Sequence, residues 1–233
     1  MPRLTLSNDN VMIYDDFLPR NAFEALLTYA GSTPYRLVHR EAWHKSWHVT
    51  DGLPLIGEAT YYREDGDYQP HESSRYPTQT ALDILLEAVN AAAGDAEPLV
   101  GKRGVSWRGL AVWPFLHQRG TGLSIHRDRT IYAGAFIYYV HREWDMHWGG
   151  HLLVLDARTG ARVGPNEPRL YSFLSDDEEN RLISEPGIGL AIAPKPNRLV
   201  FLKETAYHMI TRVDADAGDR PRVTLSGFFL TYP

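Results

Sequence analysis

The sequence contains no cysteine. This absence excludes disulfide bonds, thiolate nucleophiles, iron–sulfur clusters and zinc sites built from cysteine. Any metal must therefore be bound by histidine, aspartate or glutamate, and the ten histidines of the chain leave that possibility open.

The sequence also has no excess of positive charge and no long apolar run. The 24 Lys and Arg residues are outnumbered by 29 Asp and Glu, so the formal net charge is −5, which does not attract nucleic acid or an anionic membrane surface. No stretch approaches the roughly 20 apolar residues of a membrane-spanning helix, and the first residues do not resemble a secretory signal. We expect a cytoplasmic protein that binds neither nucleic acid nor membrane.

The length of 233 residues suits one domain with a sizeable core. We expect a single unit over residues 1–233, with a helical and irregular part in 1–100 and a sheet-rich core in 101–233. Apolar residues at helical spacing predict one helix over roughly Asn21–Tyr29 and a second between Pro77 and Gly94. The later part contains apolar runs of strand length at Val105–Trp113, Ile131–Val140, His151–Leu155, Leu190–Ala193, Arg198–Leu202 and Val223–Thr231.

Helices followed by many short strands indicate an α+β domain. We predict a double-sheet jelly roll whose N-terminal helices pack on one sheet. A polar stretch between Ala157 and Gly189 is too long for a tight hairpin. It is either a solvated loop or a loop that covers the functional site.

A histidine and an aspartate stand two positions apart, at His126 and Asp128. On an extended backbone these positions point to the same face, so both side chains can reach one metal ion. His208 lies between two predicted strands and can supply a third ligand. Two imidazoles and one carboxylate form the facial triad that holds Fe(II) with open coordination positions.

Another pair of histidines, His147 and His151, has the spacing of a helical zinc site. The intervening Trp148-Gly149-Gly150 disfavours a helix, and no glutamate stands where a general base would be needed. We expect ordinary turn residues here.

Two predicted strands carry polar side chains suited to binding a carboxylate. With period two, Arg222, Thr224 and Ser226 share one face of the last strand. Arg222 is either a surface arginine paired with an acid or an inward fork that grips a carboxylate, with Ser226 adding a hydrogen bond. Tyr139 ends a strand of small residues, where its hydroxyl either lines a cavity or lies at the edge of the core.

Together these residues resemble the iron(II)- and 2-oxoglutarate-dependent dioxygenases, in particular the prolyl 4-hydroxylase-like branch. The resemblance spans nearly the whole chain and is weakest in residues 34–75 and 157–189. It is carried by Val11–Pro19, Trp113-Pro114, Gly120-Thr121-Gly122, His126-Arg127-Asp128, Ile137-Tyr138-Tyr139, Trp144, Gly149-Gly150, Leu152, Pro194–Phe201, His208 and Arg222.

The resemblance implies a double-stranded β-helix that binds Fe(II) through His126, Asp128 and His208 and uses 2-oxoglutarate and dioxygen. It also implies that Arg222 and Tyr139 bind the distal carboxylate of 2-oxoglutarate. Hydroxylation of an unactivated C–H bond would release succinate and CO2. Because Asp128 supplies the carboxylate that halogenating relatives lack, halogenation is disfavoured.

The substrate is not fixed by these residues. Trp113 stands where related enzymes often carry a tyrosine that contacts the cosubstrate, so we treat it as a candidate substrate contact together with Arg36 and Arg40. We expect a small metabolite, such as an amino acid or a biosynthetic intermediate. A peptidyl residue, as for protein prolyl hydroxylases, and a non-catalytic metal- or ligand-binding barrel are the alternatives, and desaturation or ring closure would use the same iron.

Overall fold

The computed structural model describes residues 2–38, 51–63, 74–128, 131–155, 172–173 and 189–231. Its helices are α1 (Arg20–Ser32), α2 (Ala81–Ala92) and the short α3 (Glu97–Val100), with 3-10 helices η2 (Met146–Trp148) and η3 (Ala215–Ala217). Its strands are β1 (Arg3–Ser7), β2 (Val11–Asp15), β3 (Arg36–Leu37), β4 (Leu55–Ile56), β5 (Thr60–Arg63), β6 (Ser74–Arg75), β7 (Gly109–His117), β8 (Leu123–Arg127), β9 (Tyr132–Tyr139), β10 (Leu152–Leu155), β11 (Ser172–Phe173), β12 (Gly189–Ile192), β13 (Leu199–Lys203), β14 (His208–Ile210) and β15 (Arg222–Leu230).

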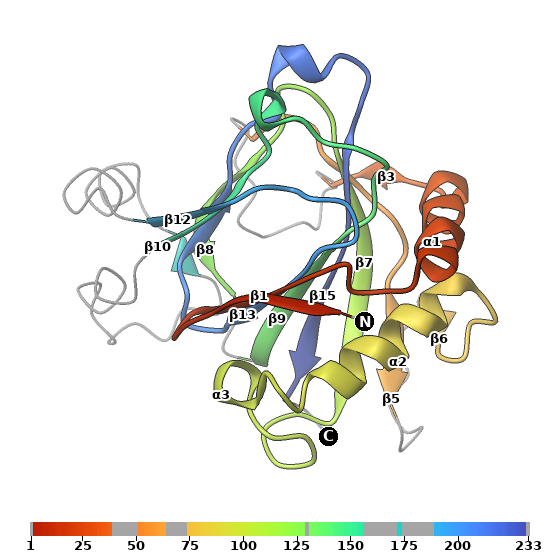
Figure 1. Cartoon of the computed structure of the whole chain (residues 1–233), viewed down its shortest axis with the longest axis vertical. Coiled ribbons are helices and arrows are strands. Elements are labelled where there is room, and N and C mark those ends of the chain that lie inside the picture. Colours follow the sequence, from red (N-terminus) through yellow and green to blue (C-terminus); the bar gives the residue numbers. More distant parts are fainter. Residues whose placement is uncertain are drawn as a thin grey trace.

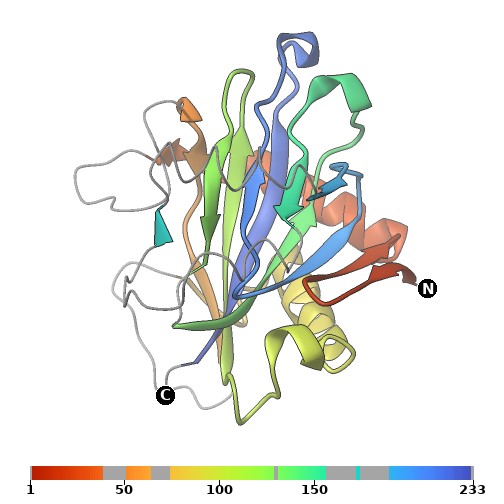
Figure 2. The ribbon, with the colours of Figure 1, turned by 90° about the vertical axis from the view of Figure 1, so that its left-hand side faces the viewer.

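The strands form two sheets (Figures 1 and 2). The large sheet has the order β1-β2-β13-β9-β15-β7-β4-β3, with β5 also paired to β7 and β6 paired to β5. The small sheet has the order β11-β8-β14-β10-β12. Pairings among the described strands are antiparallel except for β5–β6. The prediction of a mostly antiparallel, sheet-rich second half is thus confirmed.

The two larger buried clusters among the described residues connect the helices and the two sheets. One joins side chains of α1 and α2, such as Leu26 and Leu85, with Phe136, Phe201 and Phe229 of the large sheet. The other joins alternate positions of the large-sheet strands with the small sheet, and it contains Val11, Ile13, Ala135, Ile137, Tyr139, Leu152, Val154, Ile192, Val200, Leu202 and Ala206. Side chains of β9 alternate between the two clusters, because Ile137 and Phe136 belong to different ones.

Both predicted helices are present, with different boundaries. The first runs from Arg20 to Ser32, longer than predicted. The second begins only at Ala81, because the Asp83 carboxylate accepts hydrogen bonds from the backbone N–H groups of Thr78 and Gln79 and holds them in a turn before the helix.

The boundaries predicted for the first strand of the second half, Val105–Trp113, are wrong. Residues 105–108 precede the strand, which runs from Gly109 through Pro114 to His117. The Pro114 carbonyl accepts from the Gly57 N–H, on the side where β7 passes from β5 to β4. The N–H that Pro114 lacks would point to the same side, between β4 and β5. The proline therefore costs no hydrogen bond of the ladder between β7 and β15.

Gly227 lies in β15 between β7 and β9, where a side chain has no room. A Cβ there would collide with the Ala111 carbonyl oxygen and lie 2.5 Å from Cζ of Phe136. Gly227→Ala should therefore lower the free energy of unfolding by about 1–3 kcal/mol, measured by urea denaturation. Gly31→Ala is the matched control, because a Cβ there meets nothing within 4 Å and alanine suits a helix better, by up to about 1 kcal/mol. Equal effects of the two substitutions would contradict this packing.

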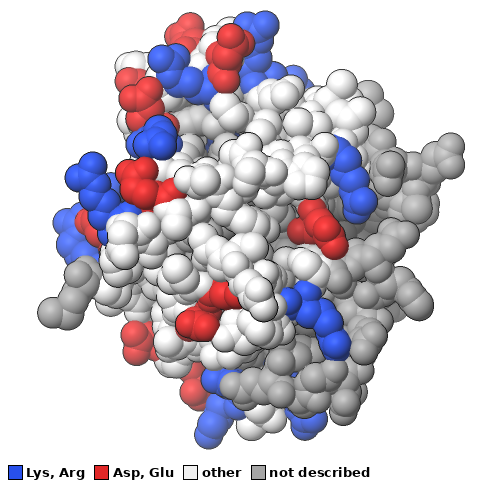
Figure 3. All heavy atoms as spheres, turned by 90° about the vertical axis from the view of Figure 1, so that its right-hand side faces the viewer, with Lys and Arg blue, Asp and Glu red and all other residues white. Residues whose placement is uncertain are grey.

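On the face that carries α1 and α2, basic and acidic side chains of the described residues lie beside one another, with a broad uncharged area between them (Figure 3). Exposed ion pairs among the described residues include Arg142–Glu24 and Arg220–Glu143. Within the described ranges, no helix is long and apolar enough to cross a membrane.

Candidate active site

The two predicted histidine ligands lie side by side on neighbouring strands of the small sheet. His126 on β8 and His208 on β14 are directly opposite in the antiparallel register, and their ring centroids are 4.4 Å apart. Both histidines were expected outside strands, whereas the structure places them within strands. Asp128 directly follows β8, two residues beyond His126.

His126, Asp128 and His208 converge. Each residue offers one ligand atom, and these atoms all lie within 4.8 Å of one another. The imidazoles are 6% and 5% exposed, respectively. A converging set of two imidazoles and one carboxylate fits a divalent metal with open coordination positions.

Hydrogen bonds fix the tautomer of both imidazoles. Nδ1 of His126 donates to the Ser124 carbonyl oxygen at 2.8 Å, and Nδ1 of His208 donates to the Ala206 carbonyl oxygen at 2.9 Å. Because a carbonyl oxygen can only accept, the proton of each neutral ring lies on Nδ1 and the lone pair on Nε2. Such outer hydrogen bonds orient metal-binding histidines and make them better ligands.

Arg222 is the largest charged group inside the protein. It begins β15, is 0% exposed, and its Nη2 donates to the Tyr139 hydroxyl at 3.4 Å. Its Nε and Nη1 have no hydrogen-bond partner among the described residues. A buried cation with two unsatisfied donors is costly, so this site fits an anion that accepts from the guanidinium fork.

Three imidazoles surround Arg222 without compensating its charge. Burial, and then the charge of Arg222, holds the pKa of His117 well below its usual value and lowers the pKa of His151. The pKa of His141 is lowered to about 4, mainly by burial and in part by the charge of Arg222, although the carbonyl oxygens of Pro194 and Val223 oppose the shift. All three rings are therefore neutral near pH 7, so none of them adds charge beside Arg222.

Ser226 and Tyr139 lie at different distances from this cation. Tyr139 contacts Arg222 directly, with the guanidinium carbon 5.0 Å from its ring centroid. Ser226 lies four residues further along β15, roughly 13 Å in an extended strand, and its hydroxyl donates to Thr224 Oγ1 at 3.1 Å. Thr224, between them, is buried and directly opposite Tyr139. The sequence did not predict Thr224 as a binding residue, although its place on the face of Arg222 was a usable signal.

Of the three candidate substrate contacts, Trp113 and Arg36 fall within the described residues. Trp113 is opposite Ser226 in the register, and its ring meets Tyr61 and Phe228 with centroids 5.9 Å and 5.8 Å away. Arg36 lies exposed on β3 at the far edge of the large sheet. Arg40 lies outside the described residues.

Most of the polar stretch 157–189 also lies outside the described residues. Within it, Phe173 of β11 pairs with His126, so this part of the stretch runs beside the strand that carries this predicted ligand.

His147 lies in η2, which ends at Trp148, so His147 and His151 do not share an α-helix, as predicted.

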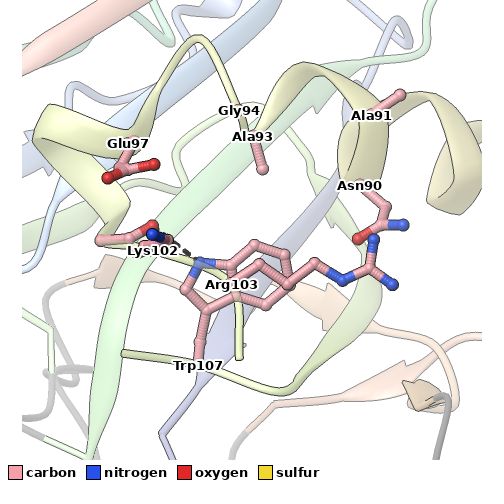
Figure 4. Close-up of a pocket in the computed structure, with 9 residues that line it drawn as sticks. Asn90, Ala91, Ala93, Gly94, Glu97, Lys102, Arg103 and Trp107 are labelled. Atoms are coloured by element: carbon pink, nitrogen blue, oxygen red, sulfur yellow. Dashed lines mark hydrogen bonds between the residues drawn. The ribbon is translucent and has the colours of Figure 1, made fainter. Parts of the chain in front are cut away.

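A separate cavity of about 360 Å³ lies between α2, α3 and the start of β7 (Figure 4). Asn90, Lys102 and Trp107 are among its lining residues, and the Trp107 indole N–H donates to the Gly101 carbonyl at 3.0 Å. It contains none of the residues discussed above and is distinct from the candidate active site.

The two antiparallel sheets, the converging triad and the buried arginine define the class of protein: a non-haem metal oxygenase built on a sheet barrel. Residues 112–230, slightly more than half of the chain, match the 2OG-Fe(II) oxygenase superfamily. The chain belongs to this family. It is a 2-oxoglutarate-dependent oxygenase, for which the family implies Fe(II), 2-oxoglutarate and dioxygen.

Solved structures show the same fold at low sequence identity. A Pseudomonas putida prolyl-4-hydroxylase matches with a TM-score of 0.57 and 16% identity over 96% of this chain and 93% of that one. A Trichoplax adhaerens prolyl hydroxylase, in complex with a hypoxia inducible factor peptide fragment, matches with 0.55 and 16% over 96% and 84%. The 2-oxoglutarate-dependent epimerase SnoN from nogalamycin biosynthesis matches with 0.55 and 12% over 95% and 78%. No curated protein sequence matches significantly.

Proposed function

We propose that this oxygenase hydroxylates an unactivated C–H bond of a small metabolite, such as an amino acid or a biosynthetic intermediate. One domain over residues 1–233 would form the double-stranded β-helix, with the N-terminal helices on its large sheet. His126, Asp128 and His208 would hold Fe(II), and Arg222 with Tyr139 would bind the distal carboxylate of 2-oxoglutarate. The observation that carries the proposal is the buried Arg222, whose unsatisfied donors need an anion inside the barrel.

The reaction balances as substrate C–H plus 2-oxoglutarate plus O2, giving substrate C–OH, succinate and CO2. Fe(II), when bound with its cosubstrates, supplies the oxidant for the C–H bond. The residues of the chain fix the geometry: the imidazoles present Nε2, Asp128 adds negative charge beside the metal, and Arg222 sets the direction of the cosubstrate. The apolar side chains between the sheets would exclude water from the reacting atoms.

A peptidyl substrate is the second candidate. It is favoured by the two structural neighbours that are prolyl hydroxylases, one of them bound to a peptide. The epimerase from nogalamycin biosynthesis favours a small molecule instead. Membership of the oxygenase family removes the support for a non-catalytic barrel.

Two measurements test this proposal. Anaerobic addition of 2-oxoglutarate to the Fe(II)-loaded protein should produce a metal-to-ligand charge-transfer band. Succinate release should then rise well above its substrate-free level with free amino acids or related metabolites. A rise with proline-containing peptides alone would support the peptidyl candidate and refute a small-molecule substrate. Without the charge-transfer band, the assignment of the metal and cosubstrate residues would fail.

A further inference from the structure

His117 occupies the same end of the large sheet as Arg222. It is the last residue of β7, and the register places it directly opposite Arg222, the first residue of β15. Directly opposite residues of antiparallel strands share one face, with Cβ atoms roughly 4.5–5.5 Å apart. His117 is 1% exposed, so an imidazole and a guanidinium are enclosed together.

A carboxylate bound at this end would have room for a donor besides the guanidinium. Its two oxygens offer about four acceptor sites, of which a bidentate arginine uses two and the Tyr139 hydroxyl can use one. A neutral imidazole keeps one N–H. Burial and the charge of Arg222 keep His117 in that form, so its N–H can donate to a carboxylate near pH 7.

We propose that His117 is a further cosubstrate-binding residue, whose ring N–H donates a hydrogen bond to the carboxylate that Arg222 grips. This inference rests on the proposed function, because it takes the carboxylate of 2-oxoglutarate as the anion at Arg222. It adds a donor from β7, a strand that supplies none of the residues the sequence predicts to bind the cosubstrate.

The other two imidazoles near Arg222 are alternative donors to the same carboxylate, and their contacts and positions distinguish them. Nε2 of His141 lies 3.0 Å from the Pro194 carbonyl oxygen and Nδ1 lies 3.2 Å from that of Val223, so its one N–H is already used within the protein. His151 is the rival donor, because its Nε2 is buried and has no partner among the described residues. His151 comes from the segment before β10 rather than from the strand next to Arg222.

Three variants separate these possibilities: His117→Leu, His117→Gln and His151→Leu. The dissociation constant of 2-oxoglutarate is measured by anaerobic calorimetry on the full-length protein loaded with Fe(II). His117→Leu should weaken binding about 10- to 100-fold, the range of a hydrogen bond to a charged group. His117→Gln, which restores an N–H donor, should recover most of that loss, whereas His151→Leu should stay within about threefold of the wild type.

Steady-state kinetics give the second measurement. His117→Leu should raise the KM for 2-oxoglutarate while kcat stays nearly constant, because the lost contact is uniform binding. Should the leucine variant fail to fold by circular dichroism, His117→Met fills similar space without a donor and provides the same comparison.

Each outcome supports or overturns the role of His117 in binding 2-oxoglutarate. Unchanged affinity in His117→Leu, equal losses in the leucine and glutamine variants, or a loss confined to His151→Leu would overturn the role of His117. Failure of the wild-type protein to bind 2-oxoglutarate would instead overturn the proposed function, so the two failures are distinguishable.

Discussion

Arg222→Met should weaken the binding of 2-oxoglutarate by roughly 30- to 5,000-fold. Removing one partner of a buried, hydrogen-bonded charge pair costs about 2–5 kcal/mol, and each 1.36 kcal/mol is a factor of ten. Calorimetric titration of the Fe(II)-loaded protein measures the change. Arg222→Lys is the control that keeps a charge but loses the planar fork, and we expect its affinity to lie between those of the wild type and the methionine variant.

The same substitution should have the opposite effect on the protein without cosubstrate. Arg222 is fully buried with two unsatisfied nitrogens, so an apolar side chain of similar length removes a desolvation cost. The Tm of the unliganded methionine variant should equal or exceed that of the wild type, while the rise in Tm that 2-oxoglutarate gives the wild type should disappear. A lower Tm combined with unchanged cosubstrate affinity would show that Arg222 is a structural residue.

Asp128→Ala should lower the affinity for Fe(II) by more than about 100-fold, beyond the loss that follows removal of an outer partner of a metal ligand. The substitution removes the only anionic ligand of the triad. Anaerobic Fe(II) titration should show no charge-transfer band with 2-oxoglutarate, and succinate release should fall to background.

A parallel pair of histidine variants controls for this result. His208→Ala should behave like Asp128→Ala, because its ligand atom belongs to the same converging set. His147→Ala should leave metal binding unchanged, since His147 is exposed in η2 and outside that set. Retention of iron by both Asp128→Ala and His208→Ala would place the metal elsewhere.

Local sequence patterns predicted the parts of the site that depend on one strand. The two-residue spacing of His126 and Asp128 put both on one face. Period-two alternation put Arg222 on the polar face of the last strand, but it left open whether that face is turned inward. These patterns work because side-chain direction in a strand is set by the backbone itself. The pairing of His126 with His208 depends instead on the register between β8 and β14, which no local pattern specifies; the position of His208 between two predicted strands made it only a candidate for the third ligand.

What the sequence missed depends on strand ends and sheet neighbours. Because the predicted strand stopped at Trp113, His117 was never placed opposite Arg222. In the structure the strand continues through Pro114 to His117. A proline is tolerated there because it lies where β7 passes from its pairing with β5 to its pairing with β4. Arg36 lies exposed on the edge strand β3, and its contact with the substrate stays a prediction.

The two halves of the candidate active site belong to different sheets: the triad to β8, its end and β14, and Arg222 to β15. Apolar side chains such as Ile137 and Val154 pack between the sheets and set the distance between the two halves. These side chains take no part in the chemistry of either half. These side chains therefore serve both the stability of the core and the alignment of the site. A substitution there can leave the protein folded and still put the two halves out of alignment.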